Sequence, residues 1–368
     1  MIKSWDYLNE YKLLKHKIDK KITKVLKSGT LFFGKENKRF EKNFIKINKS
    51  KYGLAVGSGT DALILSLKAL NIGINDEVIT VSNTAIPTAA AIKSVGATIK
   101  FVDVGTDYLI NVEKIKNAIT KKTKAIIPVH LYGQACEMKK IISLAKKYSL
   151  KVIEDCAQAQ GAEYDKIKVG NFGDTGCFSF YPTKILGAYG DGGFVVTSNF
   201  KTYKKLKRLR FYGLEQDDKK KWWNNKYYSI ETGFNSRLSE IQAGILNVKL
   251  DMLNEFINRR RFIANIYNNE IINKDIIKPV ENRYNRHVYH LYVVSHKNRN
   301  QILNKLKRQK IFLGIQYPYP LHKMKAYRTN DFKLKNSETF SKKIFSLPIY
   351  PHLDKNSLKI IIKNLNSL

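Results

Sequence analysis

The chain has 368 residues, of which 43% are hydrophobic and 11% aromatic, a composition typical of a packed globular protein and not of a disordered one. No stretch approaches about 18 uninterrupted apolar residues and the first residues hold no signal-peptide core, so we expect a cytoplasmic protein without a membrane partner. The formal net charge is +35, yet the lysines are spread among Ile and Asn over the whole length without a nucleic-acid-binding module, which disfavours a nucleic-acid partner.

Strands and helices alternate through the first half of the chain. Apolar residues at helical spacing predict helices over residues 7–27 and 35–48, separated by a glycine-bounded loop. Five strand–helix repeats then follow within about a hundred residues, which predicts an α/β fold whose mostly parallel sheet is covered on both faces. The predicted strands are 52–56, 77–81, 98–104, 124–129 and 151–155, and the predicted helices are 60–70, 84–95, 111–119 and 136–148.

Ligands of such sheets bind at the carboxyl ends of the strands. Glycine or polar residues stand at each of these ends, and we therefore expect them to converge on one crevice. They are Gly57, residues 83–85, Asp103, His130 and Asp155.

The elements after residue 155 become shorter and less regular. The patterns predict strands over 176–182 and 192–197, a helix over 200–210, a long loop over 216–236 and a long helix over 238–272. A strand over 287–294 and helices over 298–308 and 354–366 complete the chain. We predict a large domain over residues 1–250 and a smaller one over residues 251–368.

The turn after the first strand of the alternating region has the spacing of a phosphate-binding loop. Gly57, Gly59 and Ala62 satisfy G-x-G-x-x-G/A, but Glu77 begins the next strand instead of ending it, so a dinucleotide site is disfavoured. The lysine of a P-loop is missing as well. The turn predicts a generic anion site with N–H groups at a helix N-terminus and hydroxyls on Ser58 and Thr60; an ordinary capped turn is the alternative.

The three cysteines are far apart and form no C-x-x-C pair. They have no histidine at metal-ligand spacing, so we predict buried free thiols and no metal site. They are Cys136, Cys156 and Cys177.

Three further residues suggest a chemistry when they are taken together. Lys184 stands among apolar residues, where a poorly solvated amine has a lowered pKa and becomes a nucleophile toward carbonyls. Asp155 ends an apolar strand and Ser179 lies in another, and each alone has an ordinary structural explanation. Pyridoxal phosphate requires an amine for a Schiff base, a carboxylate that keeps its ring nitrogen protonated, and donors for its phosphate. These residues and the Gly59–Thr60 turn supply all three requirements.

At these residues the chain resembles the sugar aminotransferases of the DegT/DnrJ/EryC1/StrS family. The resemblance implies the α/β fold-type I architecture of PLP-dependent aminotransferases, with a large domain around a mostly parallel mixed sheet and a smaller C-terminal α+β domain. It covers nearly the whole length through motifs that occur in order: "SGTLFFGKENKRFE", "GSGTDAL", "DEVITVSNTAIPTAAAIKSVGA", "FVDV", "PVHLYGQ", "EDCAQAQGA", "FSFYPTKILGAYGDGG", "GFNSRLSEIQAGIL", "QYPYPLH" and "LPIYPHL".

The resemblance also implies a role for each residue. Lys184 is the catalytic residue that forms the Schiff base, and pyridoxamine 5'-phosphate is the intermediate form of the cofactor. The cofactor-binding residues are Gly59, Thr60 and Ser179 for the phosphate, Asp155 for the ring nitrogen, Gln158 for the ring hydroxyl, and Asn235 from the second subunit of a homodimer. The expected substrate contacts are Tyr181, Lys226, Tyr317 and His322.

Two departures from the family pattern bear on the substrate. Ala85 stands where many relatives carry an aromatic residue, and this "NTA" start resembles the branch that aminates C3 of dTDP-linked 3-oxo-6-deoxyhexoses. The segment "GIQYPYPLHKMKAY" agrees, although the usual His-Tyr-Pro begins with Gln316. Lys184 argues against the related dehydratases, in which a histidine replaces the lysine.

The expected activity is therefore transfer of an amino group from L-glutamate to the C3 ketone of a dTDP-3-oxo-6-deoxyhexose. The product would be a Fuc3N- or Qui3N-type sugar for a glycan such as lipopolysaccharide or for a natural product. A basic surface would attract this dianionic substrate, and Lys226 could pair with one of its charges. The alternatives are a C4 aminotransferase of the perosamine kind and, in a different class, a non-catalytic regulator or nucleic-acid-binding protein with the same fold.

Overall fold

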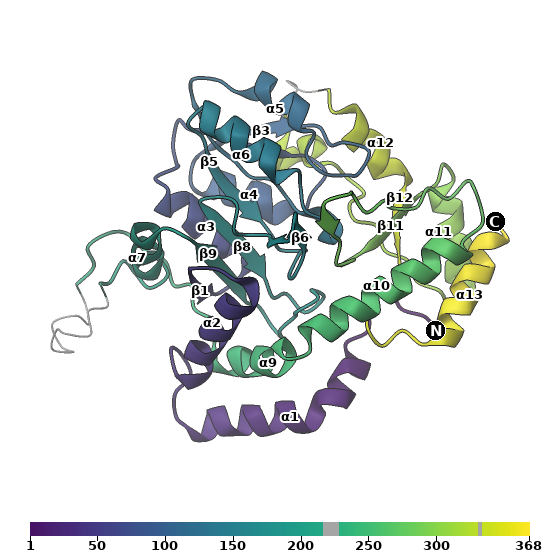
Figure 1. The fold of residues 1–368 in the computed structure, drawn as a ribbon, viewed down its shortest axis with the longest axis horizontal. Helices are drawn as coiled ribbons and strands as arrows, with labels where there is room; N and C mark the ends of the chain where they lie inside the picture. The colour runs from purple at the N-terminus through teal and green to yellow at the C-terminus, as the bar shows by residue number, and fades with distance from the viewer. Residues whose placement is uncertain (216–227, 330–332) are drawn as a thin grey trace.

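Figure 1 shows the computed structural model, which describes residues 1–215, 228–329 and 333–368. Its centre is a seven-stranded sheet of order β1-β9-β8-β5-β4-β2-β3. Only β9 runs antiparallel to its two neighbours, so the prediction of a mostly parallel mixed sheet is confirmed. The strands are β1 (Tyr52–Val56), β2 (Glu77–Val81), β3 (Thr98–Val102), β4 (Thr123–Ile126), β5 (Lys151–Asp155), β8 (Thr175–Ser179) and β9 (Gly193–Thr197).

Helices cover both faces of this sheet (Figure 1). Successive strand residues point to opposite faces, and Val78 and Ile79 accordingly belong to two different hydrophobic clusters. The cluster around Val78 contains side chains of α3 (Gly59–Ala69), α4 (Ile86–Ser94) and α7 (Phe200–Leu209). The cluster around Ile79 contains side chains of α1 (Leu8–Lys27), α2 (Lys35–Asn48), α5 (Val112–Ala118) and α6 (Met138–Lys147).

The N-cap residue of α2 is Gly34, which offers no capping side chain. The buried carboxylate of Glu240 replaces the cap, because it accepts hydrogen bonds from the backbone N–H groups of Gly34, Glu36 and Asn37 at 2.8–2.9 Å. Free N–H groups at a helix N-terminus favour a negative charge. This contact therefore fixes the N-terminal helices to the segment that follows the sheet.

The long helix predicted over 238–272 is two helices, α9 (Glu240–Leu250) and α10 (Leu253–Glu270). They are joined by a turn in which the N–H of Met252 donates to the carbonyl of Lys249. The break lets α9 pack on α1 and α2 while α10 extends away from the sheet (Figure 1). Apolar periodicity continues across a turn this short, so the sequence pattern did not reveal it.

A second core lies beyond α10. It is built around the antiparallel pair β11 (Tyr292–Ser295) and β12 (Ile344–Leu347), with α11 (Arg299–Arg308) and α13 (Lys355–Asn366). Helix α12 (Lys335–Lys343) precedes β12, and neither was predicted. The predicted strand 287–294 is shorter because the N–H groups of Val288 and Leu291 bond to the carbonyls of Gly133 and Tyr132 instead of a strand.

The two cores share a helix and a terminus. Helix α10 contributes Phe256 to the sheet core and Tyr267 to the second core, while Ile2 pairs with Ile311 and brings the N-terminus to the second core. The domain boundary at residue 250 stays a prediction. A small sheet of β6 (Glu163–Tyr164), β7 (Ile167–Lys168) and β10 (Asn285–Arg286), also not predicted, links the two regions. Among the described residues no helix is both long and apolar enough to cross a bilayer.

Candidate active site

The turn before α3 closes against the carboxyl end of β8. Ser58 caps the helix by accepting a hydrogen bond from the N–H of Asp61 at 3.0 Å. A Cβ at Gly59 would lie 2.6 Å from the Cβ of Ser179, so only glycine allows this approach. The helix N-terminus and the Ser179 hydroxyl are thereby brought to one place, which supports the predicted anion site.

A cavity of about 220 Å³ lies at this edge of the sheet. Six of the predicted catalytic and cofactor-binding residues, from five separate elements or loops, line it together. They are Gly59, Thr60, Asp155, Gln158, Ser179 and Lys184, and the predicted substrate residue Tyr181 lines it as well.

Asp155 is buried at the end of β5, and its carboxylate is held on both oxygens. The hydroxyl of Thr88 donates to Oδ2 at 2.8 Å and the N–H of Ala157 donates to Oδ1 at 3.1 Å. Burial raises the pKa of this carboxyl, although the two hydrogen bonds and the charge of Lys184 oppose the shift. A cation beside the carboxylate would offset its desolvation.

Lys184 lies in the loop after β8 and is partly buried. Burial lowers the pKa of its amine to about 8, while the charge of Asp155 opposes the decrease. The amine lines the cavity that contains Asp155 and also a neighbouring cavity of about 280 Å³. An amine that is partly buried and partly neutral near pH 7 is suited to act as a nucleophile.

Gln158 connects the sheet to the C-terminal region. Its Oε1 accepts a hydrogen bond from the N–H of Tyr132, and its Nε2 donates to the hydroxyl of Tyr317, both at 2.8 Å. Tyr317 and Tyr181 line the neighbouring cavity together with Gln158. Both tyrosines therefore lie within the reach of a ligand that contacts Lys184.

Two predicted residues that the structure describes, Asn235 and His322, line neither cavity. Asn235 is exposed, and its backbone forms an isolated antiparallel β-bridge with Phe211. His322 is buried, with its ring nitrogens hydrogen-bonded to Ser82 at 2.6 Å and to Glu338 at 3.1 Å. Lys226 lies outside the described residues.

The predicted convergence of strand ends holds only in part. Thr84, Ala85 and Asp155 line the cavity. The prediction is wrong for Asp103, whose carboxylate instead accepts hydrogen bonds from the N–H groups of residues 336 and 337 at the start of α12. This helix was not predicted, so its need for a cap was not visible.

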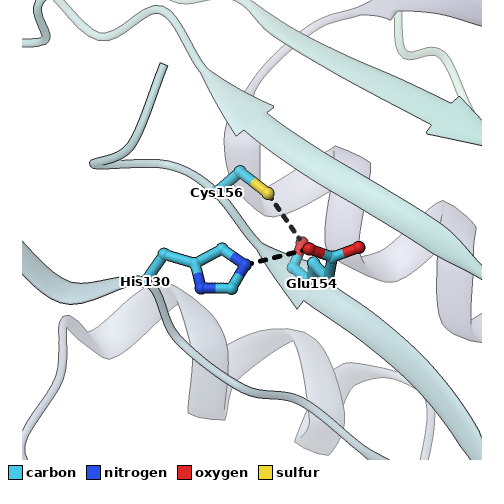
Figure 2. A group of neighbouring side chains, drawn as sticks. All are labelled: His130, Glu154 and Cys156. Carbon is cyan, nitrogen blue, oxygen red and sulfur yellow. Dashed lines mark hydrogen bonds and ion pairs between the residues drawn. The ribbon is translucent and has the colours of Figure 1, made fainter. Parts of the chain in front are cut away.

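His130 also lies away from the cavity, in a buried group with Glu154 and Cys156 (Figure 2). The ring Nδ1 accepts a hydrogen bond from the N–H of Cys136, so Nε2 carries the proton and donates to Glu154 at 3.0 Å. Burial raises the pKa of the Cys156 thiol well above its ordinary value, which keeps it protonated. The Glu154 carboxylate also accepts hydrogen bonds from the N–H groups of Gly170, Phe172 and Gly173.

The ring nitrogens of His130 and the carboxylate oxygens of Glu154 are therefore already hydrogen-bonded, and we interpret this group as a structural network. It fixes the loop that follows β5 and the segment that leads into β8. All three cysteines of the chain are buried free thiols, as predicted.

A family model described as the DegT/DnrJ/EryC1/StrS aminotransferase family matches residues 12–366. The chain belongs to this family. It is 41% identical to a dTDP-3-amino-3,4,6-trideoxy-alpha-D-glucose transaminase of Micromonospora megalomicea subsp. nigra, over 95% of this chain and 94% of that protein. It is 42% identical to a dTDP-3-amino-3,6-dideoxy-alpha-D-galactopyranose transaminase of Aneurinibacillus thermoaerophilus, with the same coverage.

The fold is also that of a solved family structure. The crystal structure of S. venezuelae DesV, in complex with a ketimine intermediate, superposes with a TM-score of 0.93 at 35% sequence identity, covering 98% of this chain and 96% of that one. The predicted fold class is thus confirmed by the architecture and by these likenesses.

Thr88 was not predicted from the sequence, and Thr84 was predicted only as part of the strand end 83–85, without a role of its own. Thr88 positions Asp155, and a polar residue in the alanine-rich helix 86–94 was the available signal. Thr84 lines the cavity, and its hydroxyl is buried without a hydrogen-bond partner among the described residues. Buried polar groups are nearly always paired, so Thr84 is left available for a ligand.

Proposed function

We propose that this aminotransferase moves an amino group from L-glutamate to the C3 ketone of a dTDP-linked 3-oxo-6-deoxyhexose. The proposal depends on one observation, the placing of Lys184 and Asp155 on the wall of a cavity that is also lined by the N-terminus of α3. The two relatives described above are named for dTDP-3-amino sugars, which supports C3 as the position and dTDP as the nucleotide.

The residues of the cavity fit pyridoxal 5'-phosphate. Asp155 would hold the ring nitrogen, Gln158 the ring hydroxyl, and the N–H groups and hydroxyls of Gly59, Thr60 and Ser179 the phosphate. The unpaired hydroxyl of Thr84 is a further donor for this group. When bound, the cofactor supplies an electron sink for the negative charge that develops on the substrate carbon.

Lys184 is the residue that moves the proton. Because burial holds its pKa at about 8, a fraction of the amine is neutral at pH 7 and can accept a proton from the donor carbon. The same amine, once protonated, can deliver the proton to the carbon of the acceptor ketone. Asp155 maintains the charge of the ring nitrogen, and Thr88 and the N–H of Ala157 keep that carboxylate in place.

The active form would be a homodimer in which Asn235 reaches the phosphate in the partner's cavity. Asn235 is exposed in the single chain, and apolar side chains near it are exposed too, which suits a surface covered by a second subunit. They are Tyr228, Ile230 and Phe234. Tyr181 and Tyr317 are our candidates for sugar contacts, and the roles of Lys226 and His322, the cytoplasmic location and the destination of the sugar remain predictions.

The assignment of Lys184 can be tested directly. Borohydride reduction of the holoenzyme should fix the cofactor covalently to a peptide containing Lys184, as peptide mass mapping would show. A Lys184→Ala variant should lose amino transfer, whereas Lys146→Ala, which removes an exposed lysine, should retain it. Turnover of keto sugar by Lys184→Ala would refute the assignment.

The position of amination needs a second experiment. The enzyme should convert dTDP-3-oxo sugars with glutamate, and both C4 epimers should be offered because the two relatives differ in the hexose of their product. Activity with 4-oxo sugars alone would favour the perosamine-type alternative. Salt-dependent DNA binding without any amino transfer would favour the regulator, an alternative that the charge of +35 raised.

A further inference from the structure

A second cavity adjoins the proposed cofactor cavity. Its volume is about 280 Å³, and the two cavities share Gln158, Tyr181 and Lys184. The remaining wall comes from the N-terminal segment, from the loop after β8, from α10 and from the C-terminal region. Those residues are Ser4, Trp5, Thr183, Arg260, His290, Leu291, Gln316, Tyr317, Ser346 and Ile349. Among the described residues no aspartate or glutamate lines it, whereas Lys184, Arg260 and His290 do.

Arg260 is buried in this wall with its guanidinium in a fixed orientation. Its Nη1 lies within hydrogen-bond distance of the carbonyls of Tyr289 at 3.3 Å, His290 at 3.1 Å and Ile349 at 2.5 Å. Its Nε has no hydrogen-bond partner among the described residues, although it is buried. A buried guanidinium donor without a partner is rare, because its desolvation is not compensated.

His290 presents a second unpaired donor or acceptor in the same wall. Its side chain is 6% exposed, and its Nδ1 is buried without a partner among the described residues. Burial and the charges of Lys184 and Arg260 lower the pKa of this ring well below its ordinary value, so it is neutral. A neutral imidazole carries one N–H, which can donate to an anion.

No acidic side chain of the described residues hydrogen-bonds to the Nε of Arg260. Glu10 is the acid whose charge acts on Arg260, but its Oε1 is ion-paired with Lys249 at 2.5 Å and lies on neither cavity wall. The positive charge of Arg260 is therefore only partly compensated inside the protein, and the cavity beside Lys184 suits a small anion.

We propose that Arg260 and His290 form the subsite for a carboxylate of the amino donor, an inference that rests on the proposed function. The donor must bring its amine to the place of the Lys184 amine, and an amino acid carries a carboxylate close to that amine. The keto sugar carries its charges on the diphosphate, remote from the reacting carbon. An anion site that shares a wall with Lys184 thus matches the donor and not the acceptor.

The test compares Arg260→Lys and His290→Asn with Arg259→Lys. Arg259 is a matched control, because it lies on the same helix and bonds to the carbonyls of Pro351 and Leu353 but lines neither cavity. Binding of glutarate, an unreactive dicarboxylate, to each holoenzyme is measured by titration calorimetry. The two half-reactions, with glutamate alone and with keto sugar alone, are followed by the cofactor's absorbance.

We expect both subsite variants to bind glutarate at least tenfold more weakly and to raise the KM for glutamate by a similar factor. The KM for the keto sugar should change less than twofold, and Arg259→Lys should behave as the wild type. L-Alanine and 4-aminobutyrate as donors then separate the two carboxylates, because the first lacks the distal carboxylate of glutamate and the second lacks the α-carboxylate.

Unchanged glutarate binding in a folded His290→Asn variant would overturn the subsite, even if Arg260→Lys failed to fold. A selective rise in the KM for the keto sugar would also overturn it, because it would assign the cavity to the acceptor. Failure of the proposed function is distinguishable, since absence of amination of every keto sugar would leave glutarate binding measurable in the wild type and weakened in both variants.

Discussion

Replacing Thr88 with valine would remove one hydrogen bond from the carboxylate of Asp155 at almost constant volume. The Thr88 hydroxyl donates to Oδ2 at 2.8 Å, both residues are buried, and the N–H of Ala157 remains on the other oxygen. In the native protein each carboxylate oxygen of Asp155 therefore accepts one hydrogen bond from the protein. The change therefore acts on the orientation and basicity of one functional group.

A hydrogen bond to a charged group contributes about 1.5–3 kcal/mol. At about 1.4 kcal/mol per factor of ten, its loss should weaken cofactor binding or lower kcat/KM by roughly 10- to 150-fold. The pKa of Asp155 is already raised by burial, and losing a donor to the ionised form raises it further. Because the carboxylate is the working form, the acid limb of the rate profile should move to higher pH.

Cofactor affinity would be measured by titrating cofactor-free protein, and the pH profile by steady-state rates. Thr80→Val is the control, because Thr80 is equally buried but donates to the carbonyl of Ile127, away from the cavity. It should reduce stability by about 1 kcal/mol and leave the profile unchanged. If Thr88→Val changed neither the cofactor affinity nor the acid limb, or if both variants behaved alike, the positioning role of Thr88 would be wrong.

Three further predictions follow from single contacts. Reconstitution of cofactor-free protein with pyridoxal phosphate should become about tenfold faster from pH 7 to pH 9. The Lys184 amine has a pKa of about 8, so its neutral fraction rises from about one tenth to about nine tenths over this range. A rate that stays constant with pH in stopped-flow measurements would contradict this prediction. Glu240→Gln should lower the free energy of unfolding in urea by about 1–3 kcal/mol, because an amide cannot accept hydrogen bonds from all three N–H groups at the start of α2. An unchanged unfolding midpoint would exclude the capping role of Glu240. The buried thiols should react with a colorimetric disulfide reagent only in denaturant, and rapid labelling of Cys156 in the native protein would show that it is accessible.

The sequence predicted the central sheet well because its signals are local. Buried parallel strands such as β2, with all five residues buried, appear as continuous apolar runs, and the helices between them show apolar periodicity. The site residues that follow strand ends, such as Asp155, could be placed for the same reason. Their chemical roles came from the motif resemblance and not from periodicity.

Features that depend on distant segments could not be predicted in this way. Asp103 bonds to the start of α12, more than 230 residues later, and His322 packs against Ser82 across a similar separation. Arg260 and His290 became candidates only because the fold leaves their nitrogen atoms unpaired beside Lys184. Such vacancies in hydrogen bonding leave no pattern along a single sequence.

The position of Lys184 between two cavities has a consequence for how one amine can serve two half-reactions. The cavity with Asp155 and the helix N-terminus is suited to hold a phosphorylated ring throughout, whereas the cavity with Arg260 must accept and release ligands. Gln158 lies on both walls and is held by Tyr132 on one side and Tyr317 on the other. Movement of the segment that carries Tyr317 would therefore shift Gln158, which is proposed to contact the cofactor's ring hydroxyl. With the proposed roles, donor and acceptor would contact the same amine and the same amide, and substrate exchange would be coupled to the orientation of the cofactor.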